Sequence, residues 1–423
     1  MSKPRIFIVG SGAREHAIGW KLTQEGAEII SSPGNAGLAS LGRCYGIAAE
    51  DIEGMTKLSK DLAPDLVVIG PEGPLDTGLA DSLRANGLLV FGPSAAATLV
   101  TESSKLLAKQ VMQAAGVPTA DYRAYRPWEF EEALAQLRTS VFPIVIKEDG
   151  LAAGKGVKIA RSRKAAEAFV KSLANAEKTF LLEDYLEGVE CSVMAITDGT
   201  HIVTFPAIQD YKLSGVGDTG ENTGGMGAVT PIAACDLHML ERVENEILLP
   251  MLKELQKRGT PFVGCLYGGL MITKTGPVVM EFNARFGDPE TEIAMLMLDE
   301  SLLQLLLSAA RGKLSGSRRA RMHSGACACV VLASGGYPGN YEKGKLISGV
   351  LESSSWEDTA VFHANTELRK NGVYSIGGRV LVVTARRRKL EEALRSIYSI
   401  AGLIQFDKAY LRPDIGSNAN KLP

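Results

Sequence analysis

The sequence predicts a multidomain protein of mixed α/β and α+β class, and three observations support this prediction. A chain of 423 residues exceeds what one hydrophobic core usually serves. The N-terminal part alternates apolar strands with helical segments, which is typical of a parallel sheet covered by helices. The middle of the chain has short strands at hairpin spacing, and the C-terminal part is rich in strands. We therefore expect three domains, at residues 1–102, 103–312 and 313–423.

The first domain begins with the apolar run "RIFIVG", which is bounded by glycine as a buried strand often is. Helical patterns and further apolar runs follow in alternation, so the strands are expected to lie parallel in one small sheet. The expected strands are 5–10, 27–31, 65–70 and 87–94, and the expected helices are 14–24 and a second one that follows 71–74 and ends at about Asn86.

The second domain is expected to begin with a helix at 105–116. Ser103 or Ser104 can cap its first turn, and Gly116 and Pro118 supply its end. Hairpin spacing then indicates an antiparallel α+β arrangement. Its helices are expected near 128–138, 163–175, 236–258 and 289–311, and its strands at 143–149, 156–161, 179–186, 191–197, 201–207, 263–273 and 277–283.

The third domain follows the polar, basic segment 312–321, which is expected to be a linker. It should be a small strand-rich unit with one helix at about 388–400. Its "GACACVVLAS" places Cys327 and Cys329 in alternation, as core-facing strand residues are. The six cysteines of the chain have no metal-binding spacing, so they are interpreted as buried reduced thiols.

Composition excludes several kinds of partner. A net charge of -2 and 22% charged residues give no single-signed field that would attract nucleic acid or acidic lipid. No apolar run reaches the roughly 18 residues of a membrane span. We expect no nucleic-acid partner, no membrane partner and a cytoplasmic location.

The segment "GSGARE", Gly10 to Glu15, follows a strand and opens a helix, where backbone N–H groups and the helix dipole can hold a phosphate. Glu15 replaces the third glycine of the dinucleotide fingerprint, and "SSPGNAG" after the second strand lacks the acid that binds an adenosine ribose. A phosphate-bearing substrate is therefore favoured over NAD. The alternative is a tight turn that binds nothing.

A second glycine-rich segment, "KEDGLAAGKGVKIA" at 147–160, lies between two expected strands. Its tip can close over a triphosphate, although it lacks the spacing of a Walker loop. With Lys105, Lys147 and Lys155 it supplies three cations, and the alternative is a mobile hairpin with solvated lysines.

A third glycine-rich segment spans 210–231 and has no apolar periodicity, so we expect a long structureless loop. Its polar residues and glycine backbone suit the recognition of a small zwitterion or a phosphate. The alternative is simple disorder.

The segment "EFNARFGDPE", Glu281 to Glu290, places ionisable side chains directly after an apolar strand. Glu281 and Asn283 share one face of this strand, and carboxylate and amide oxygens suit Mg²⁺ or Mn²⁺. Arg285 continues that face and can brace a developing phosphate charge. Asp288 and Glu290 begin a helix, where the helix dipole by itself favours acids.

These segments resemble, in the same order, those of the phosphoribosylamine–glycine ligases, also called glycinamide ribonucleotide synthetases. The resemblance covers essentially the whole chain. It rests on "GSGAREHA", "GPE" at 70–72, "DGLAAGKGV", "DTGENTGGMGA" and "EFNARFGDPE". It implies an N-terminal Rossmann-like domain, a central ATP-grasp fold of two α+β subdomains with a lid subdomain at about 121–186, and a small C-terminal domain.

The resemblance implies a two-step ligation in purine biosynthesis. ATP phosphorylates the carboxylate of glycine, and the amine of 5-phosphoribosylamine then displaces phosphate. An acyl phosphate is needed because a carboxylate does not accept an amine at neutral pH. The implied partners are glycine, 5-phosphoribosylamine and ATP with Mg²⁺ or Mn²⁺, and we expect a monomer or a weak homodimer.

The resemblance also implies residue roles. Glu281 and Asn283 bind the metal, and Arg285, Lys147 and Asp288 are the expected catalytic residues. The nucleotide is expected at Lys105, Lys147, Gly154, Lys155, the backbone of Glu183 to Leu186, and Glu190, with 149–156 as the lid loop. The phosphoribosylamine and glycine are expected at Gly10, Gly12, Asn35, Glu72, Asp210, Arg285 and Asp288.

The chain departs from the family pattern at several positions. Leu213 and the uncharged 214–217 replace a basic residue and a Lys-Asp pair, and Glu221 stands where proline is usual. "KED" at 147–149, "FHANT" at 362–366 and "YSIGGRV" at 374–380 also differ. The strand 263–273 lacks an acid found in many ATP-grasp relatives, so the metal is expected to depend on ATP oxygens.

Two alternatives to this function stay open. The chain could be another ATP-grasp carboxylate–amine ligase that acts on a different phosphorylated substrate. It could also be a catalytically silent nucleotide sensor, although a sensor would need neither the metal pair nor Arg285.

Overall fold

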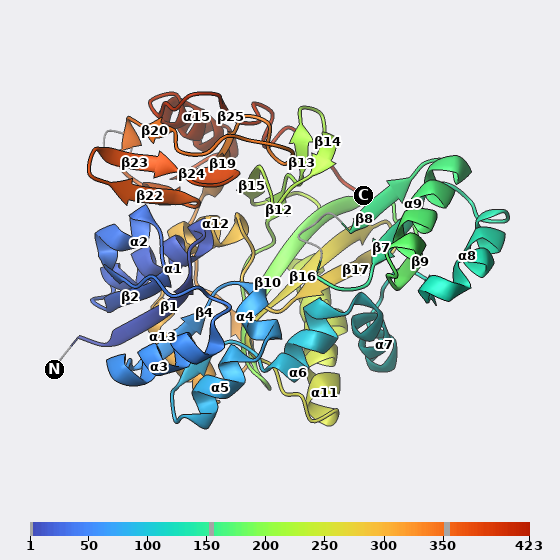
Figure 1. Cartoon of the computed structure of the whole chain (residues 1–423), viewed down its shortest axis with the longest axis horizontal. Coiled ribbons are helices and arrows are strands. Elements are labelled where there is room, and N and C mark those ends of the chain that lie inside the picture. The colour runs from blue at the N-terminus through green and yellow to red at the C-terminus, as the bar shows by residue number, and fades with distance from the viewer. Residues whose placement is uncertain (1–2, 152–155, 351–355) are drawn as a thin grey trace.

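The computed structural model describes residues 3–151, 156–350 and 356–423 (Figure 1). Its N-terminal sheet has parallel strands in the order β3-β2-β1-β4-β5. The strands are β1 Arg5–Gly10, β2 Glu28–Pro33, β3 Gly42–Cys44, β4 Leu66–Ile69 and β5 Val90–Phe91. The helices are α1 Ala13–Gln24, α2 Ala36–Leu41, α3 Ile52–Leu62, α4 Glu72–Asp76, α5 Leu79–Ala85 and α6 Ala95–Thr98.

This sheet confirms the four predicted strands and the first helix. The helix expected to end near Asn86 is divided into α4 and α5, because Gly78 adopts a positive φ of 90° between them. Three helices, α2, α3 and the short α6, were not predicted. The signal for α3 was present, since Asp51 caps it and its apolar residues recur at helical spacing.

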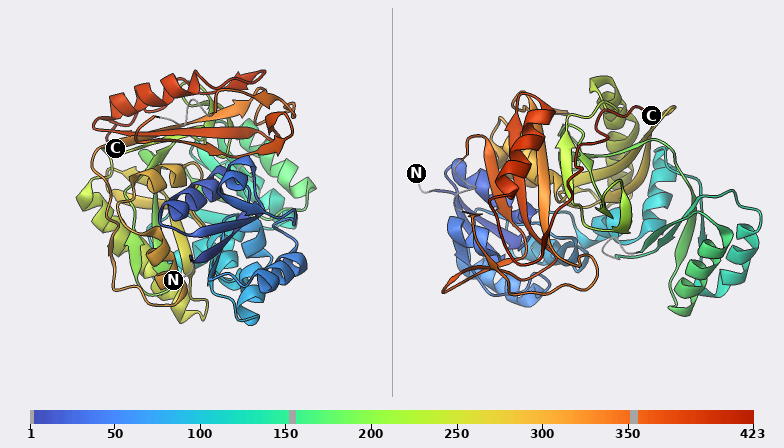
Figure 2. Two further views of the ribbon diagram at one scale, coloured as in Figure 1. Left: turned by 90° about the vertical axis from the view of Figure 1, so that its left-hand side faces the viewer. Right: turned by 90° about the horizontal axis from the view of Figure 1, so that it is seen from above.

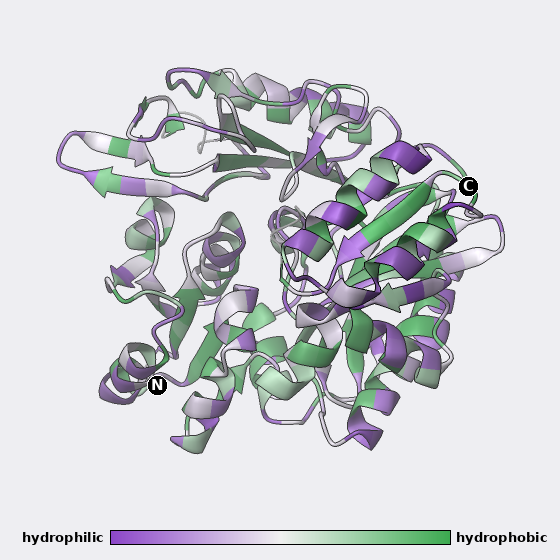
Figure 3. Ribbon diagram, turned by 45° about the vertical axis from the view of Figure 1, so that its right-hand side comes forward, coloured by the Kyte–Doolittle hydropathy of each residue, from purple (hydrophilic) through white to green (hydrophobic). Residues whose placement is uncertain are grey.

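The next part of the chain forms a separate, antiparallel sheet in the order β6-β9-β7-β8. Before it, η1 Leu99–Ser103 leads into α7 Lys105–Ala115, whose cap is Ser104, with its hydroxyl accepting from Leu107 N at 3.1 Å. The elements of the sheet are β6 Tyr122–Tyr125, η2 Pro127–Glu129, α8 Phe130–Leu137, β7 Ile144–Glu148, β8 Val157–Ala160, α9 Arg163–Asn175 and β9 Phe180–Asp184. Figure 3 shows α8 and α9 with hydrophilic residues on their outer faces, and their buried residues pack on the sheet.

A long central sheet follows in the order β17-β16-β10-β11-β18. Its strands are β10 Val189–Asp198, β11 Ile202–Thr204, β16 Val263–Thr273, β17 Gly276–Asn283 and β18 Arg318–Arg319. Its helices are α10 Leu237–Val243, η3 Glu244–Leu248, α11 Leu249–Lys257, α12 Glu290–Met297 and α13 Leu302–Ala310. The segment 312–321, expected to be a linker, thus contributes β18, which pairs with β11.

The C-terminal sheet has the order β12-β15-β19-β24-β21, with β25 also paired to β19. Its strands are β12 Gln209–Asp210, β15 Gly227–Thr230, β19 Ala326–Ser334, β21 Thr359–His363, β24 Arg379–Arg387 and β25 Ala409–Tyr410, and α15 Leu390–Ala401 packs on it. A smaller sheet contains β20 Leu346–Ile347, β22 Thr366–Arg369 and β23 Gly372–Ser375. Cys327 and Cys329 are fully buried in β19, as predicted.

The expectation of a structureless loop at 210–231 is wrong. This segment contains β12, the hairpin of β13 Leu213–Gly215 and β14 Thr219–Asn222, and β15. β15 pairs with β19 across a long sequence separation. Its strand conformation is stabilised by backbone hydrogen bonds to that neighbour, and such pairing leaves no periodic side-chain pattern in a glycine-rich segment.

The three larger sheets lie around a common centre, where α12 lies between the N-terminal and C-terminal sheets (Figures 1 and 2). Buried residues of α1, α12, β16 and β19 belong to one hydrophobic cluster that joins these parts. Among the described residues, no helix is both long enough and apolar enough to cross a membrane.

Candidate active site

Glu281 and Asn283 lie at the end of β17, on the opposite face of the strand from Phe282, which is only 2% exposed. Within the described part of the chain, no hydrogen bond or ion pair engages the Glu281 carboxylate. Burial raises the pKa of Glu281, but the charges of Lys212 and Lys147 outweigh it, so the pKa is lowered overall. Glu281 is therefore an ionised carboxylate among cations.

Arg285 is held between two carboxylates from the N-terminal third of the chain. Its Nε lies 3.3 Å from Glu72 Oε2, and its Nη2 lies 3.1 Å from Glu102 Oε1. The same Nη2 donates to Asn283 Oδ1 at 3.3 Å. The charge of Arg285 lowers the pKa of Glu72 to about 2. A single guanidinium thus connects the end of β17 with α4 and η1.

Two lysines share one buried carboxylate in the lid sheet. Lys147 Nζ lies 2.9 Å and Lys109 Nζ lies 3.1 Å from Glu183 Oε2. Lys147 also donates to the Met280 carbonyl at 2.8 Å, which brings β7 against β17. Burial lowers the pKa of Lys109 to about 8, although Glu183 acts in the opposite direction. Lys147 is therefore fixed beside the strand that carries Glu281.

Lys105, at the first turn of α7, donates to the Gly150 carbonyl at 2.7 Å. Burial lowers its pKa, and Glu281 opposes that shift. The predicted residues Gly154 and Lys155 lie outside the described residues. Leu186 lies in the segment between β9 and β10, where the chain passes from the lid sheet to the central sheet.

Glu190, near the start of β10, pairs with Lys212. Lys212 Nζ also lies 4.0 Å from Asp210 Oδ1. Burial raises the pKa of Asp210 to about 8, although Lys212 opposes it. Lys212 was not predicted as a site residue, and its contacts place it at the centre of an acidic group.

The phosphate loop joins β1 to α1. Gly10 has a φ of 127°, and a side chain there would collide with Glu15, so this turn requires glycine. Glu15 accepts a hydrogen bond from the backbone N–H of Gly12 at 2.6 Å. Asn35 donates to the carbonyls of Ser11 at 2.8 Å and Gly12 at 3.2 Å, which fixes the loop from the other side.

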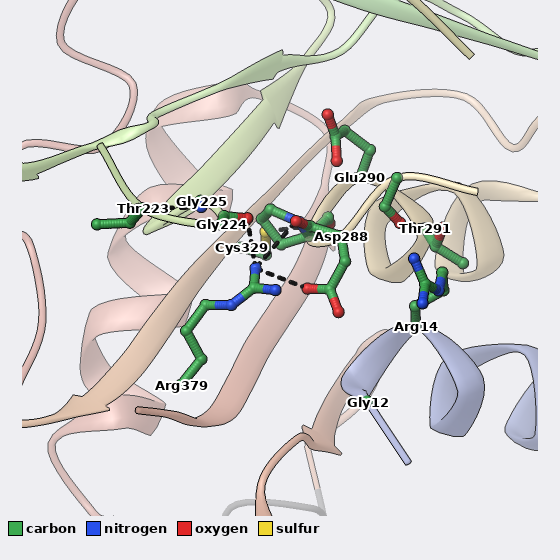
Figure 4. A network of polar contacts seen from close by, with 12 residues as sticks. Gly12, Arg14, Thr223, Gly224, Gly225, Asp288, Glu290, Thr291, Cys329 and Arg379 are labelled. Carbon is green, nitrogen blue, oxygen red and sulfur yellow. Dashed lines mark hydrogen bonds and ion pairs between the residues drawn. The ribbon is translucent and has the colours of Figure 1, made fainter. Parts of the chain in front are cut away.

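Asp288 approaches the phosphate loop from the opposite side of the site, and a Cβ placed on Gly12 would lie 3.4 Å from Asp288 Oδ2. Figure 4 shows Asp288 paired with Arg379, whose Nη1 lies 2.9 Å from Asp288 Oδ1 and also donates to the Gly224 carbonyl. Gly225 has a φ of 108°, and a Cβ there would lie 2.4 Å from Pro289 Cδ. The glycine-rich segment can therefore approach Asp288 only because it lacks side chains.

The helix dipole alone was the expected reason for an acid at position 290, but Glu290 makes specific buried contacts. It is only 2% exposed and accepts hydrogen bonds from Ser192 at 3.0 Å and Tyr267 at 2.8 Å. Beside it, Glu292 is fully buried, and burial together with Asp288 raises its pKa well above the usual range. Both acids are therefore buried in the first turn of α12, next to Asp288.

The structure therefore brings together most of the predicted residues. Asn283, Arg285 and Glu72 are joined by direct contacts. Glu281 shares a face of β17 with Asn283, and Lys105 and Lys147 act on it through their charges. Sequence reasoning missed Glu102, Lys109, Lys212, Tyr267, Arg379 and Arg14, whose Nη1 donates to the Phe286 carbonyl at 3.1 Å, and it assigned no contact to Glu290. Of these, Arg14, Glu290 and Arg379 lie inside quoted segments and Lys212 lies inside the range 210–231, and that position was the available signal.

The donor set at β17 fits a divalent metal of the hard class. The Glu281 carboxylate accepts no hydrogen bond from the residues that the structure describes. A carboxylate and an amide oxygen are ligands that Mg²⁺ and Mn²⁺ accept, with the remaining positions taken by water or phosphate oxygens. Among the described residues, no group of three or more His, Cys, Asp or Glu side chains is arranged to hold a metal.

Solved structures with this fold include a biotin carboxylase from Campylobacter jejuni, which is 15% identical with a TM-score of 0.74 over 96% of this chain and 93% of that chain. This likeness shows the fold alone. An ATP-grasp domain profile matches residues 103–291. The two sheets, the lysines between them and the acidic strand end together define an ATP-grasp enzyme.

The particular family follows from closer relatives. Profiles for the N, ATP-grasp and C domains of phosphoribosylglycinamide synthetase match residues 4–100, 103–291 and 327–418. The phosphoribosylamine–glycine ligases of Rhodopirellula baltica and Nostoc are 40% and 41% identical, over 99% and 98% of this chain and 98% and 100% of theirs. A crystal structure of the Thermotoga maritima ligase is 32% identical with a TM-score of 0.83, covering 97% of this chain and 100% of that one. The chain belongs to the phosphoribosylglycinamide synthetase family.

Proposed function

We propose that the chain ligates glycine to 5-phosphoribosylamine at the expense of ATP, giving glycinamide ribonucleotide, ADP and phosphate. The observation that carries the proposal is the contact between two motifs. Gly12 of the phosphate loop lies beside Asp288 of the "FNARFGDPE" segment. A phosphosugar on the loop and a nucleotide at β17 would have their reacting groups adjacent. The reaction forms the C–N bond and a P–O bond between the γ-phosphorus and the glycine oxygen. It breaks the bond between the γ-phosphorus of ATP and its bridging oxygen, and then the C–O bond of the glycyl phosphate, so that this oxygen leaves with phosphate.

In the first half-reaction, the glycine carboxylate oxygen attacks the γ-phosphoryl group of ATP. Arg285, Lys147 and Lys105 would stabilise the negative charge on the transferring group, since they are fixed by Glu72, Glu183 and the Gly150 carbonyl rather than free in water. Glu281 and Asn283 would hold Mg²⁺ or Mn²⁺. A bound metal would neutralise phosphate charge and orient the triphosphate.

The nucleotide would lie between the lid sheet and the central sheet. The backbone from Glu183 to Leu186 would contact the adenine, and Glu190 would accept from the ribose hydroxyls. Gly154 and Lys155 would contribute from the lid loop. Glu190 is paired with Lys212 in this structure, so the ribose would have to compete with that ammonium.

In the second half-reaction, the amine of 5-phosphoribosylamine attacks the glycyl phosphate and phosphate leaves. The 5-phosphate would bind at Gly10 and Gly12, with Asn35 and Glu72 near the ribose. Asp210 and Asp288 would face the glycine ammonium, and Asp288 is already held in place by Arg379 at 2.9 Å. The acyl phosphate must be shielded from water until it is attacked.

The remaining features of the proposal concern the state of the enzyme. A cytoplasmic location and a monomeric or weakly dimeric state stay predictions from the sequence. Sedimentation velocity over a range of protein concentrations checks the second, and a stable higher oligomer would contradict it.

The test is phosphate release from ATP and Mg²⁺, with phosphoribosylamine generated in the assay. Release should require both glycine and phosphoribosylamine, and Glu281→Ala should abolish it while circular dichroism and thermal unfolding stay close to the wild type. Release that does not depend on glycine would contradict the substrate assignment. Near-full activity of Glu281→Ala would contradict the metal assignment.

A further inference from the structure

The C-terminal segment 409–419 makes a set of polar contacts with the glycine-rich hairpin β13–β14. At its centre is Arg412, whose side chain is fully buried. Arg412 Nη1 donates to the Leu213 carbonyl at 2.9 Å and lies 3.0 Å from Asp218 Oδ1. Its Nε and Nη2 bind the two oxygens of Asp414 at 2.9 and 2.7 Å. Asp414 in turn accepts from the backbone N–H of Gly217 at 2.8 Å.

Two further contacts bind the same surfaces together. Tyr410 donates its hydroxyl to the Ser214 carbonyl at 2.7 Å. Asn418 donates to Asp218 Oδ2 at 3.2 Å and accepts from the Tyr211 hydroxyl at 2.6 Å. The hairpin is therefore held by the C-terminal segment at its first strand, at its turn and at Tyr211, two residues before it.

The C-terminal segment is itself fixed to α15. The hydroxyl of Tyr398 donates to the Arg412 carbonyl at 2.9 Å and accepts from the backbone N–H of Ile415 at 3.0 Å. Figure 2 shows the hairpin, in light green, beside the dark red C-terminal chain. The segment thus connects the hairpin, which has little apolar surface of its own, to the helix that packs on the C-terminal sheet.

The hairpin emerges directly from the site. Lys212, the residue before β13, pairs with Glu190, and its Nζ lies 4.0 Å from Asp210 Oδ1, so it contacts two of the predicted site residues. The Lys212 carbonyl accepts from both the backbone N–H and the hydroxyl of Thr223 at 2.8 Å, so the two ends of the hairpin are closed on each other. Arg412 binds the very next carbonyl along the chain, that of Leu213.

We propose that Arg412 and its two carboxylate partners form a clamp through which the C-terminal segment positions Lys212 in the active site. Arg412 is a positioning residue that acts through the backbone of the hairpin. This inference rests on the proposed function, because Lys212 contacts Glu190 and Asp210, which that function places at the ATP ribose and the glycine ammonium. It also explains how the chain orders 213–217, where it lacks the charged residues usual in the family.

The first test separates positioning from stability with two substitutions. Arg412→Lys keeps the charge but cannot bind Leu213, Asp218 and Asp414 together. Asp218→Asn removes charge at a side chain that is 46% exposed, and asparagine tolerates the positive φ of 53° at that position. The control is Arg395→Lys, an exposed arginine on α15 for which the described residues offer no polar partner.

Both clamp variants should lower kcat/KM for glycine by about tenfold, since a small displacement of a reacting group is costly, while the Kd for ATP stays within about twofold. Arg395→Lys should match the wild type. Equal losses in glycine turnover and in ATP affinity would mean general destabilisation and overturn the proposal. Wild-type kinetics in Asp218→Asn would overturn it too.

The second test needs no substrate. Hydrogen exchange of the amides in 212–223 should be faster in both clamp variants, with exchange at 144–150 unchanged. Unchanged exchange in 212–223 overturns the clamp whatever the activity. Failure of the proposed function has a different sign: phosphate release by the wild-type protein would not depend on glycine.

Discussion

Arg285 is the residue whose geometry most constrains the chemistry. Its guanidinium contacts Glu72, Glu102 and Asn283 at once through a rigid planar fork, a geometry that a compact ammonium does not offer. We expect Arg285→Lys to lower kcat by about 100-fold, with a smaller change in KM for ATP, because transition-state charge is stabilised by fixed donors. Steady-state kinetics with saturating glycine measures both constants. A raised KM at unchanged kcat would mean that Arg285 only binds substrate.

Glu72 gives a prediction about pH. The charge of Arg285 lowers the pKa of Glu72 from 4.5 to about 2 in the folded protein. A carboxyl with a lowered folded pKa contributes stability above its unfolded pKa and loses it as the pH falls through the folded value. The stabilisation from the pair is therefore present at neutral pH and declines between about pH 4.5 and pH 2.

We expect the thermal stabilities of Glu72→Gln and the wild type to become more similar as the solution is acidified. The midpoint of thermal unfolding should be lower in the variant at about pH 6 and closer to the wild type at about pH 3. Circular dichroism at the two pH values measures this difference. A constant gap would show that the stabilisation does not come from the ionised form of Glu72.

At the scale of elements, Ser104 joins a helix to the lid. Its hydroxyl accepts from Leu107 N at 3.1 Å as the cap of α7 and donates to Asp149 Oδ1 at 3.0 Å, just after β7. Asp149 also accepts from Leu106 N at 3.1 Å. The start of α7 and the base of the lid hairpin are therefore one hydrogen-bonded unit.

Ser104→Ala should lower the free energy of unfolding by about 1 kcal/mol, the usual effect of losing a helix cap. It should also increase hydrogen exchange at 144–150, because Asp149 loses one of its donors. Urea unfolding and hydrogen exchange measure the two effects, and Ser104→Thr, which keeps the hydroxyl, is the matched control. An alanine variant with wild-type exchange in the lid would show that the cap and the lid are independent.

At the scale of the whole molecule, Asn35 connects the first and last parts of the chain. Its amide donates to the His363 carbonyl at 2.7 Å, in addition to the phosphate-loop carbonyls, and its oxygen caps α2 by accepting from Leu38 N at 2.9 Å. The backbone N–H of His363 donates to His16 Nδ1 at 2.9 Å, which reinforces the contact. The phosphate loop is thus attached to the C-terminal sheet.

Asn35→Ala should destabilise the protein by about 1–3 kcal/mol, because it leaves buried carbonyls without donors. It should also raise KM for phosphoribosylamine, since the loop loses its support. Thermal unfolding and steady-state kinetics measure these effects. Asn35→Asp keeps the cap but not the donors, so wild-type behaviour in that variant would contradict the role given to the amide.

Much of the fold could be predicted from local patterns. Buried strands such as β1 and β16 are continuous apolar runs, and α7 has its cap and its terminal glycine in the sequence. The shared face of Glu281 and Asn283 also followed from spacing, because alternate residues of a strand point to the same side. The three domain ranges and the individual ligand contacts stay predictions.

The sequence by itself determined the kinds of group that the site contains and the order in which they occur along the chain. Only the tertiary structure decided which charges meet: Glu72 and Glu102 with Arg285, Asp288 with Arg379, and Arg412 with the hairpin. It also turned the segment 210–231 into strands. The physical reason is that these contacts join residues far apart in sequence, and their partners are set by backbone pairing and burial, which leave no periodic signal in a glycine-rich or charged segment.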